Sequence, residues 1–317
     1  MSSITAIAKA AGVSVASVSR VFNDRPNVRP EVRDRVLACA RELGYRPRQT
    51  ARRDAVALVT GELGGGYAGQ VAKAMLATAR RRAWRLDLLA ADDVPRLAGR
   101  LLAGVVSIVP ETLQHAPALG ELQAEALPMV TINHRVGAVP CVRSDDRAAL
   151  CDAVGYLYAR GHRRMALLTT NNESLANTER RAGYMDGLRH AGLSLDPALV
   201  QRCTYPDEAV AKVAQLLQHH PDALIATGEG SGPIIAQALD LLGRKPGSDL
   251  SLISHELPGT SPWLLPAQTT IAQDFDGLAE HALAIIAGEL PAQDVVLPSL
   301  FHERRSVLVN AKRGVTP

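Results

Sequence analysis

The chain is poor in aromatic residues and contains no long apolar run. Aromatic residues make up 3% of the 317 residues, whereas apolar residues of all kinds reach 47%, so the core must be mainly aliphatic. No apolar run reaches the roughly 18 residues that a membrane-spanning helix needs, and a charged start followed by an apolar stretch is missing. We therefore expect a globular cytoplasmic protein with no secretory signal and no membrane partner.

Cysteine is also scarce, and its spacing fits neither a metal site nor a disulfide framework. The four cysteines are Cys39, Cys141, Cys151 and Cys203. His115 and the pair His219-His220 do not belong to a set of cysteines, histidines and acids with the spacing of a known metal site. The sequence predicts free thiols, no metal ion and no other cofactor.

Positive charge is concentrated at one end of the chain. Residues 1–53 hold eleven Lys and Arg against four acids, a net charge of +7, whereas the remainder holds 24 bases and 28 acids, a net charge of −4. A small basic head on a mildly acidic body is the charge distribution of a nucleic-acid-binding module attached to another domain. A solvated helix surface is the simpler alternative.

The stretch VSVASVSRVF, residues 13–22, fits two kinds of element. Its alternation of apolar and small polar residues favours a strand. Its apolar residues also recur at helical spacing, and Ser14 stands where an N-cap would. A second apolar stripe over 4–11 precedes it, with Gly12 between the two. Two short helices joined at a glycine form a helix-turn-helix, so we predict a helix.

A third helix is predicted over 30–45, with a proline in its first turn and Gly44 at its end. The whole run ITAIAKAAGVSVASVSRVFNDRPNVRPEVRDRVLACARELGYRP, residues 4–47, closely resembles the DNA-binding head of the lactose/galactose repressor (LacI/GalR) family. Both the AGVSxxxVSRVxN core and the ExRxRVxxxxxELGYxP tail match. The resemblance implies a lambda-repressor-like head that binds double-stranded operator DNA.

The resemblance assigns roles to residues of the second helix, which would lie in the major groove. Val15 and Ala16 occupy the two positions that discriminate operators, where an apolar side chain can contact a thymine methyl group. Arg20 occupies the position of a base reader, and a guanidinium suits guanine. Five polar residues would mainly contact phosphates, namely Ser14, Ser17, Ser19, Asn23 and Asn27.

The segment after the head departs from the family pattern. The family has a hinge helix whose leucine enters the minor groove, whereas residues 48–59 read RQTARRDAVALV. Ala51 and Arg52 match, but Arg53 or Asp54 stands where the leucine belongs, and the linker is shorter. No apolar wedge is available to kink the DNA. Either the hinge stays unformed, or Arg52 and Arg53 read the narrow groove through their charge.

The rest of the chain alternates short apolar runs with segments of helix length. Strands are predicted over 55–60, 85–91, 104–110, 128–134, 164–170, 223–228 and 250–255, with a further extended stretch around 139–145. This alternation is typical of doubly wound parallel sheets, and seven or more such units with a break near Gly161 favour two lobes. Two similar lobes form a clamshell that closes on a small molecule.

The body resembles the same family more loosely, through YLYARGHRRMALLT, ERRAGYMDGLRHAGL and LLPAQTTIAQDFDGLAEHAL. The resemblance implies an α/β fold: a periplasmic-binding-protein-like core, with effectors bound between its lobes and two protomers forming a homodimer. The expected division is a head over 1–47, a linker over 48–55, a first lobe over 56–161 plus about 273–290, and a second lobe over 162–272 plus about 291–310.

Seven residues are candidates for the effector site: Tyr67, Asp145, Arg180, Tyr205, Glu229, His255 and Glu256. Arg180 aligns with the family's ligand-binding arginine, and a charged donor in a cleft can hold a hydroxyl or a carboxylate. Gly228-Glu229 replaces the family's Asn-Asp. Residues 254–257, SHEL, replace its Gly-aromatic-Asp-Asp, where Glu256 could accept hydroxyl protons in the aspartate's place. An aromatic ring at a strand end can stack on a sugar, although packing is its usual role.

Two other functions compete with this prediction. Residues 64–69 spell GxGxxG between a strand and a helix, with Asp87 and Asp92 further on, which is the dinucleotide-binding pattern. A redox-sensing transcription factor is therefore an alternative. An enzyme is not expected, because GEGSG around Ser231 lacks the first glycine of a nucleophile elbow. A transport protein shares the clamshell but has no DNA-binding head.

We therefore predict an effector-responsive transcription factor, acting as a repressor on a near-palindromic operator. Its ligand would be a small polar molecule of the sugar type, whose preference for one lobe arrangement changes the affinity for DNA.

Overall fold

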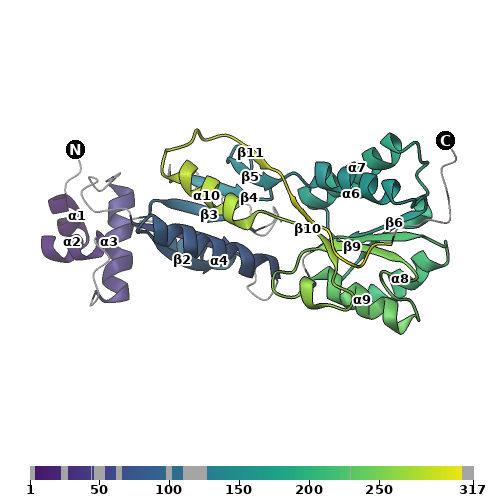
Figure 1. Ribbon diagram of the computed structural model, residues 1–317. Helices are drawn as coiled ribbons and strands as arrows, with labels where there is room; N and C mark the ends of the chain where they lie inside the picture. Colours follow the sequence, from purple (N-terminus) through teal and green to yellow (C-terminus); the bar gives the residue numbers. More distant parts are fainter. Residues whose placement is uncertain are drawn as a thin grey trace.

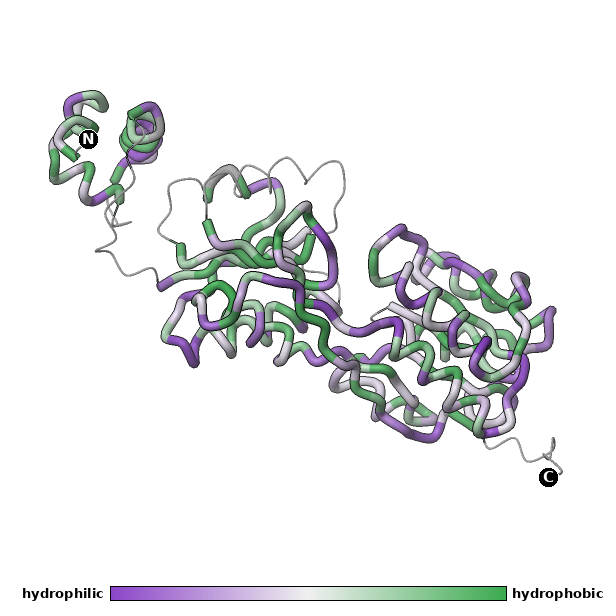
Figure 2. The backbone as a smooth tube through the Cα atoms, turned by 90° about the horizontal axis from the view of Figure 1, so that it is seen from above, coloured by the Kyte–Doolittle hydropathy of each residue, from purple (hydrophilic) through white to green (hydrophobic). Residues whose placement is uncertain are grey.

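The computed structural model describes residues 4–22, 28–43, 45, 54–61, 66–97, 102–109, 127–228 and 230–308. A small helical head lies at one end of the molecule, beyond the first of two α/β lobes (Figure 1). Viewed from above, head, first lobe and second lobe follow one another along the long axis (Figure 2).

Three helices form the head: α1 (Ile4–Ala10), α2 (Val15–Phe22) and α3 (Pro30–Glu42). The predicted helix over VSVASVSRVF is confirmed. The chain bends by 108° between α1 and α2, where Gly12 takes a φ of +63°, as a helix-turn-helix requires. Val18 and Phe22 of α2 pack with Val36 of α3 in a core that is separate from the cores of the lobes.

The first lobe contains a six-stranded sheet in the order β11-β5-β4-β3-β1-β2, in which every pairing is parallel. Its strands are β1 (Ala55–Thr60), β2 (Arg85–Ala90), β3 (Gly104–Ser107), β4 (Met129–Ile132), β5 (Cys141–Ser144) and β11 (Val295–Leu297). The helices described for this lobe are α4 (Gly66–Arg81), the 3-10 helix η1 (Ala91–Leu97) and α10 (Phe275–Ile286).

The second lobe repeats this plan, with a sheet in the order β12-β10-β9-β8-β6-β7. Its strands are β6 (Met165–Thr170), β7 (Val200–Cys203), β8 (Ala223–Ala226), β9 (Ser251–His255), β10 (Thr269–Ala272) and β12 (Leu300–His302). Its helices are α6 (Asp146–Ala159), α7 (Leu175–His190), η2 (Pro197–Leu199), α8 (Ala209–Leu217), α9 (Ser231–Leu241) and η3 (Ser261–Trp263). Only the pairing of β12 with β10 is antiparallel among the pairings described for this sheet.

The central strands of both sheets are buried on both faces, which explains why they read as continuous apolar runs. In β1, Val56 and Leu58 pack against α4 and α10, whereas the intervening residues face η1. In β6, Ala166 and Leu168 face α8 and α9, and their neighbours face α6 and α7. The predicted fold of two doubly wound lobes is confirmed.

The chain crosses between the lobes three times: between β5 and α6, between β10 and α10, and between β11 and β12. Two of our expected boundaries are corrected. We placed the first crossing near Gly161, but α6 packs its Leu150 and Val154 against Tyr184 of α7, so it belongs to the second lobe. We assigned 291–310 to the second lobe, but β11 pairs with β5 in the first sheet.

Among the helices that the structure describes, no single one has the length and apolar character to cross a membrane. Taken together, α1 and α2 have the required length and apolar composition, but the chain bends sharply between them.

Candidate functional site

The exposed side of α2 carries the residues that we predict to read DNA bases. Val18, Val21 and Phe22 face the core of the head, which leaves Val15, Ala16 and Arg20 facing outward. Val15 is 47% exposed, although burial would be favourable for its side chain. An apolar side chain and a guanidinium on one exposed helix surface suit a thymine methyl group and a guanine edge.

Hydroxyl groups hold the start of this helix in place. The Oγ of Ser14 accepts a hydrogen bond from the backbone N–H of Ser17 at 3.0 Å, which is the N-cap expected from the sequence. The two serine hydroxyls also lie 2.9 Å apart. Ser19 is half-buried on the same helix. The other residues assigned to DNA contacts, namely Asn23, Asn27, Arg52 and Arg53, lie outside the described residues. Of the linker predicted over 48–55 only its end is described, and Ala55 already belongs to β1.

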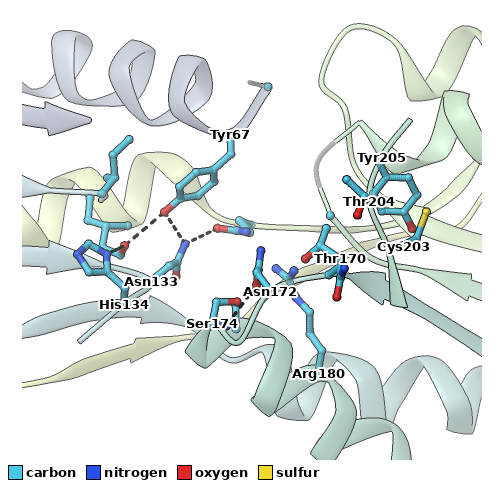
Figure 3. Close-up of a pocket in the computed structure, with 17 residues that line it drawn as sticks. Tyr67, Asn133, His134, Thr170, Asn172, Ser174, Arg180, Cys203, Thr204 and Tyr205 are labelled. Carbon is cyan, nitrogen blue, oxygen red and sulfur yellow. Dashed lines mark hydrogen bonds between the residues drawn. The ribbon is translucent and has the colours of Figure 1, made fainter. Parts of the chain in front are cut away.

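A cavity of about 460 Å³ lies between the two lobes. Its walls come from the carboxyl ends of β4, β6, β7 and β8, from the start of α4 and from α7, as expected for ligand sites in parallel α/β sheets. Tyr67, Asn133 and His134 form the first-lobe wall, opposite Thr204 and Tyr205 of the second lobe (Figure 3). This volume falls in the range of small-molecule sites.

Arg180 reaches from α7 toward the middle of this cavity (Figure 3). Its Nε donates to Oδ1 of Asp146 at 2.8 Å, and both side chains are almost fully buried. Asp146 lies in the first turn of α6, where the chain has just crossed from the first lobe. Arg180, predicted from the sequence as an effector residue, therefore lies in the cavity, but it is already paired with Asp146, which no local sequence pattern indicates.

A second polar group connects the first-lobe wall to the crossing segments. The Nδ2 of Asn133 donates to the Tyr67 hydroxyl at 3.1 Å and to Oε1 of Gln273 at 2.7 Å. Its Oδ1 accepts from the backbone N–H of Ser144 at 2.9 Å. Ser144 precedes the first crossing and Gln273 lies in the second. One amide thus joins the cavity wall to two inter-lobe segments.

Burial keeps two titratable groups of the wall, His134 and Tyr205, neutral. Burial lowers the pKa of His134 to about 4, because it outweighs the opposite effect of the hydrogen bond to the Ile132 carbonyl. Burial likewise raises the pKa of the Tyr205 hydroxyl, so this group keeps its proton. The Tyr205 hydroxyl and Nε2 of His134 are buried without a hydrogen-bond partner. Buried polar atoms without partners are costly, and a ligand could satisfy them.

Three predicted effector residues have other contacts and do not line the cavity. Asp145 caps α6, where its Oδ1 accepts from the Ala148 N–H at 3.0 Å. His255 is buried and accepts a hydrogen bond from the Gly228 N–H at 2.8 Å. Glu256 forms an ion pair with Arg304 at 2.7 Å and also accepts from Thr270. Tyr67, Arg180 and Tyr205 do line the cavity, and Glu229 lies outside the described residues.

Several polar residues of the cavity were not among our candidates: Asn133, His134, Thr170, Asn171, Asn172, Ser174, Thr204 and Gln273. Most of them stand at or just after the carboxyl end of a predicted strand, over 128–134 or 164–170. Because the carboxyl ends of parallel strands share one edge of a sheet, this placement could have identified them.

The local structure gives the dinucleotide alternative little support. Gly66 opens α4 and Gly69 lies in its first turn, whereas residues 62–65 are outside the described part of the chain. A Cβ at Gly69 would meet nothing within 4 Å, so close helix–strand packing does not require a glycine there. Asp87 lies within β2 and pairs with Arg85 at 2.9 Å. Within the described ranges, no group of three or more potential metal ligands occurs.

A helix-turn-helix head joined to a two-lobed core with an inter-lobe cavity defines a class: DNA-binding regulators whose core binds a small molecule. Comparisons with known proteins agree with this class. Residues 3–48 match the family described as bacterial regulatory proteins, lacI family, and residues 54–255 match periplasmic binding proteins and sugar binding domain of LacI family. The chain belongs to the LacI family and is a DNA-binding transcriptional regulator, not an enzyme.

Individual relatives extend over nearly the whole chain. The HTH-type transcriptional regulator RafR of Escherichia coli is 32% identical over 310 residues, which cover 91% of this chain and 89% of that protein. The structure resembles a complex of the transcriptional regulator CelR with cellobiose, with a TM-score of 0.71, 24% identity and coverage of 96% and 100%. It also resembles a lac repressor dimer bound to operator and an anti-inducer, with a TM-score of 0.71, 21% identity and coverage of 97% and 99%. At these levels of sequence identity, the two structural similarities show a shared fold and no more.

Proposed function

We propose that this protein is a homodimeric, cytoplasmic transcriptional repressor whose affinity for a near-palindromic operator is switched by a sugar-type ligand. The ligand binds in the inter-lobe cavity, where Arg180, Tyr67 and Tyr205 contact it. Two heads of one dimer bind the two half-sites, with Val15, Ala16 and Arg20 on base edges. The remaining residues that we assign to DNA, Ser14, Ser17, Ser19, Asn23, Asn27, Arg52 and Arg53, contact the backbone or the minor groove.

The observation that carries this proposal is the lining of the cavity. Amides and hydroxyls approach from both lobes, and hydrogen-bond donors and acceptors together suit a polyhydroxyl ligand. The solved CelR structure carries cellobiose, which makes cellobiose a reasonable first probe. A ligand that contacts both lobes favours one lobe arrangement over another, and this difference in affinity is what can change DNA binding.

Operator binding measured with and without candidate ligands tests the proposal. The operator is first selected from random DNA with the full-length protein, and binding is then followed by fluorescence anisotropy at fixed salt, because affinity for DNA falls steeply with salt. A panel of mono- and disaccharides is titrated against wild type and Arg180→Ala. We expect at least one sugar to change operator affinity in wild type but not in Arg180→Ala, with unchanged DNA binding in its absence.

Two outcomes contradict the proposal. A response that persists in Arg180→Ala removes this residue from the site. Dinucleotides are titrated beside the sugars: if only they change operator affinity, independently of Arg180, the ligand site moves to the segment before α4, which favours a redox sensor.

A further inference from the structure

The described wall of the cavity contains a single fully charged side chain, that of Arg180. A lone guanidinium in a cleft attracts carboxylates and phosphates, often through two parallel hydrogen bonds. Arg180 by itself would therefore select an acidic ligand. What it selects depends on the charges that surround it.

Asp146 supplies the compensating charge. Its Oδ1 lies 2.8 Å from Nε of Arg180, and the two side chains are 5% and 6% exposed, respectively. Charges interact strongly in such surroundings, because little water screens them. From the cavity, the pair acts as a polar but nearly neutral donor group, because an approaching anion meets the carboxylate as well as the guanidinium.

The other titratable groups of the wall supply no positive charge. The lowered pKa of His134, about 4, leaves its ring neutral at pH 7. Nδ1 of this ring lies 2.9 Å from the Ile132 carbonyl, which can only accept, so Nδ1 carries the proton and Nε2 is an acceptor. A hydroxyl can donate to that nitrogen, whereas a carboxylate or phosphate dianion cannot. Burial also raises the pKa of the Cys203 thiol to about 11.

We propose that Asp146 determines the charge specificity of the effector site: by neutralising Arg180 it makes the site select an uncharged polyhydroxyl ligand and reject the uronic acid or phosphate of the same sugar. Asp146 is a positioning residue, since it is not part of the cavity wall and acts through Arg180. The inference rests on the proposed function of the cavity and adds the charge of its ligand.

The chain offers a matched pair of variants. Asp146→Asn removes the carboxylate beside Arg180 and keeps the size of the side chain. Asp145→Asn makes the same change one residue earlier, at the cap of α6, where asparagine is an equally good cap and where the side chain accepts from Ala148 instead. Both variants lose one negative charge from the same helix end, but only the first leaves Arg180 without this partner.

The measurement is the dissociation constant of each neutral sugar, of its uronic acid and of its 6-phosphate, by isothermal titration with the full-length protein. Cellobiose, glucose and galactose provide the first three sets. For wild type and Asp145→Asn we expect the neutral sugar to bind at least about tenfold more tightly than its acids. For Asp146→Asn we expect this ratio to shift by at least about tenfold in favour of the acids.

An acid that binds wild type as tightly as its neutral sugar overturns the inference, and so does an unchanged ratio in Asp146→Asn. If Asp146→Asn does not fold, the comparison in wild type still decides, because an acid that binds wild type as tightly as its neutral sugar contradicts a site neutralised by Asp146. If no sugar binds wild type, the proposed function fails first, which is a different result from binding without charge selection.

Discussion

Replacing Asn133 tests whether the cavity wall is mechanically linked to the segments that cross between the lobes. Its amide makes three hydrogen bonds, to the Tyr67 hydroxyl, to Gln273 and to the Ser144 N–H. Its backbone has a φ of +60°, a left-handed conformation that asparagine tolerates better than most residues with a side chain.

The two effects can be separated by two substitutions. Each net hydrogen bond contributes about 0.5–1.5 kcal/mol, and Asn133 is only half-buried, so water replaces part of this. We expect Asn133→Gly to lower the free energy of unfolding by about 2 kcal/mol. Asn133→Ala also places a Cβ at positive φ, which should cost about 1 kcal/mol more. Urea unfolding followed by circular dichroism measures both values.

The functional consequence concerns coupling rather than binding. Because Ser144 and Gln273 belong to two different crossings, losing their shared partner should weaken the link between ligand and lobe arrangement. In Asn133→Gly we expect a sugar still to bind, while its effect on operator affinity shrinks from the range of about 5–150-fold typical of allosteric proteins toward none. Asn171→Ala is the control, since this amide lines the cavity away from the crossing segments.

Two results would refute this reasoning. Equal stability of the alanine and glycine variants would show that the backbone conformation carries no cost. Coupling that survives in Asn133→Gly, at full ligand affinity, would show that the amide does not link the cavity to the crossings.

Three further predictions concern the head, the pH response and the helix pair of the second lobe. Arg20→Ala should weaken operator binding by about 1–3 kcal/mol and binding to random DNA far less; equal losses by anisotropy would exclude base reading. The pKa of His134 is about 4 in the folded state and about 6.5 in the unfolded state. Between these two pH values the unfolded state binds more protons than the folded state, so the protein loses stability as the pH falls from about 6.5 to about 4. Between pH 7 and 5 wild type should therefore lose about 2 kcal/mol that His134→Gln does not lose, measured by urea unfolding; parallel pH curves would argue against it. Gly183→Ala should destabilise by about 1–3 kcal/mol or more, since its Cβ would lie 2.1 Å from the Arg147 carbonyl oxygen. Gly155→Ala, with nothing within 4 Å, should be neutral or stabilising by up to about 1 kcal/mol in thermal unfolding, and similar effects at both glycines would contradict the packing argument.

The sequence alone determined the elements whose signals are local. The head could be predicted in full, because Gly12, the cap at Ser14 and the apolar spacing of α2 act within a few residues of one another. The seven predicted strands also appear: burial on both faces makes most of them continuous apolar runs, whereas β2 lies at a sheet edge and is partly exposed. Short edge strands were missed: β7, β11 and β12 are three or four residues long and partly exposed, so they carry no long buried run.

Only the tertiary structure decided which polar side chains meet. Asp145 and Asp146 are neighbours in the chain, yet the first caps α6 and the second pairs with Arg180, because successive residues of a helix point in different directions. Gln273 reaches Asn133 across 140 positions of sequence because the chain returns to the first lobe at that point. Sheet order and lobe crossings set these contacts, and neither leaves a local pattern in the sequence.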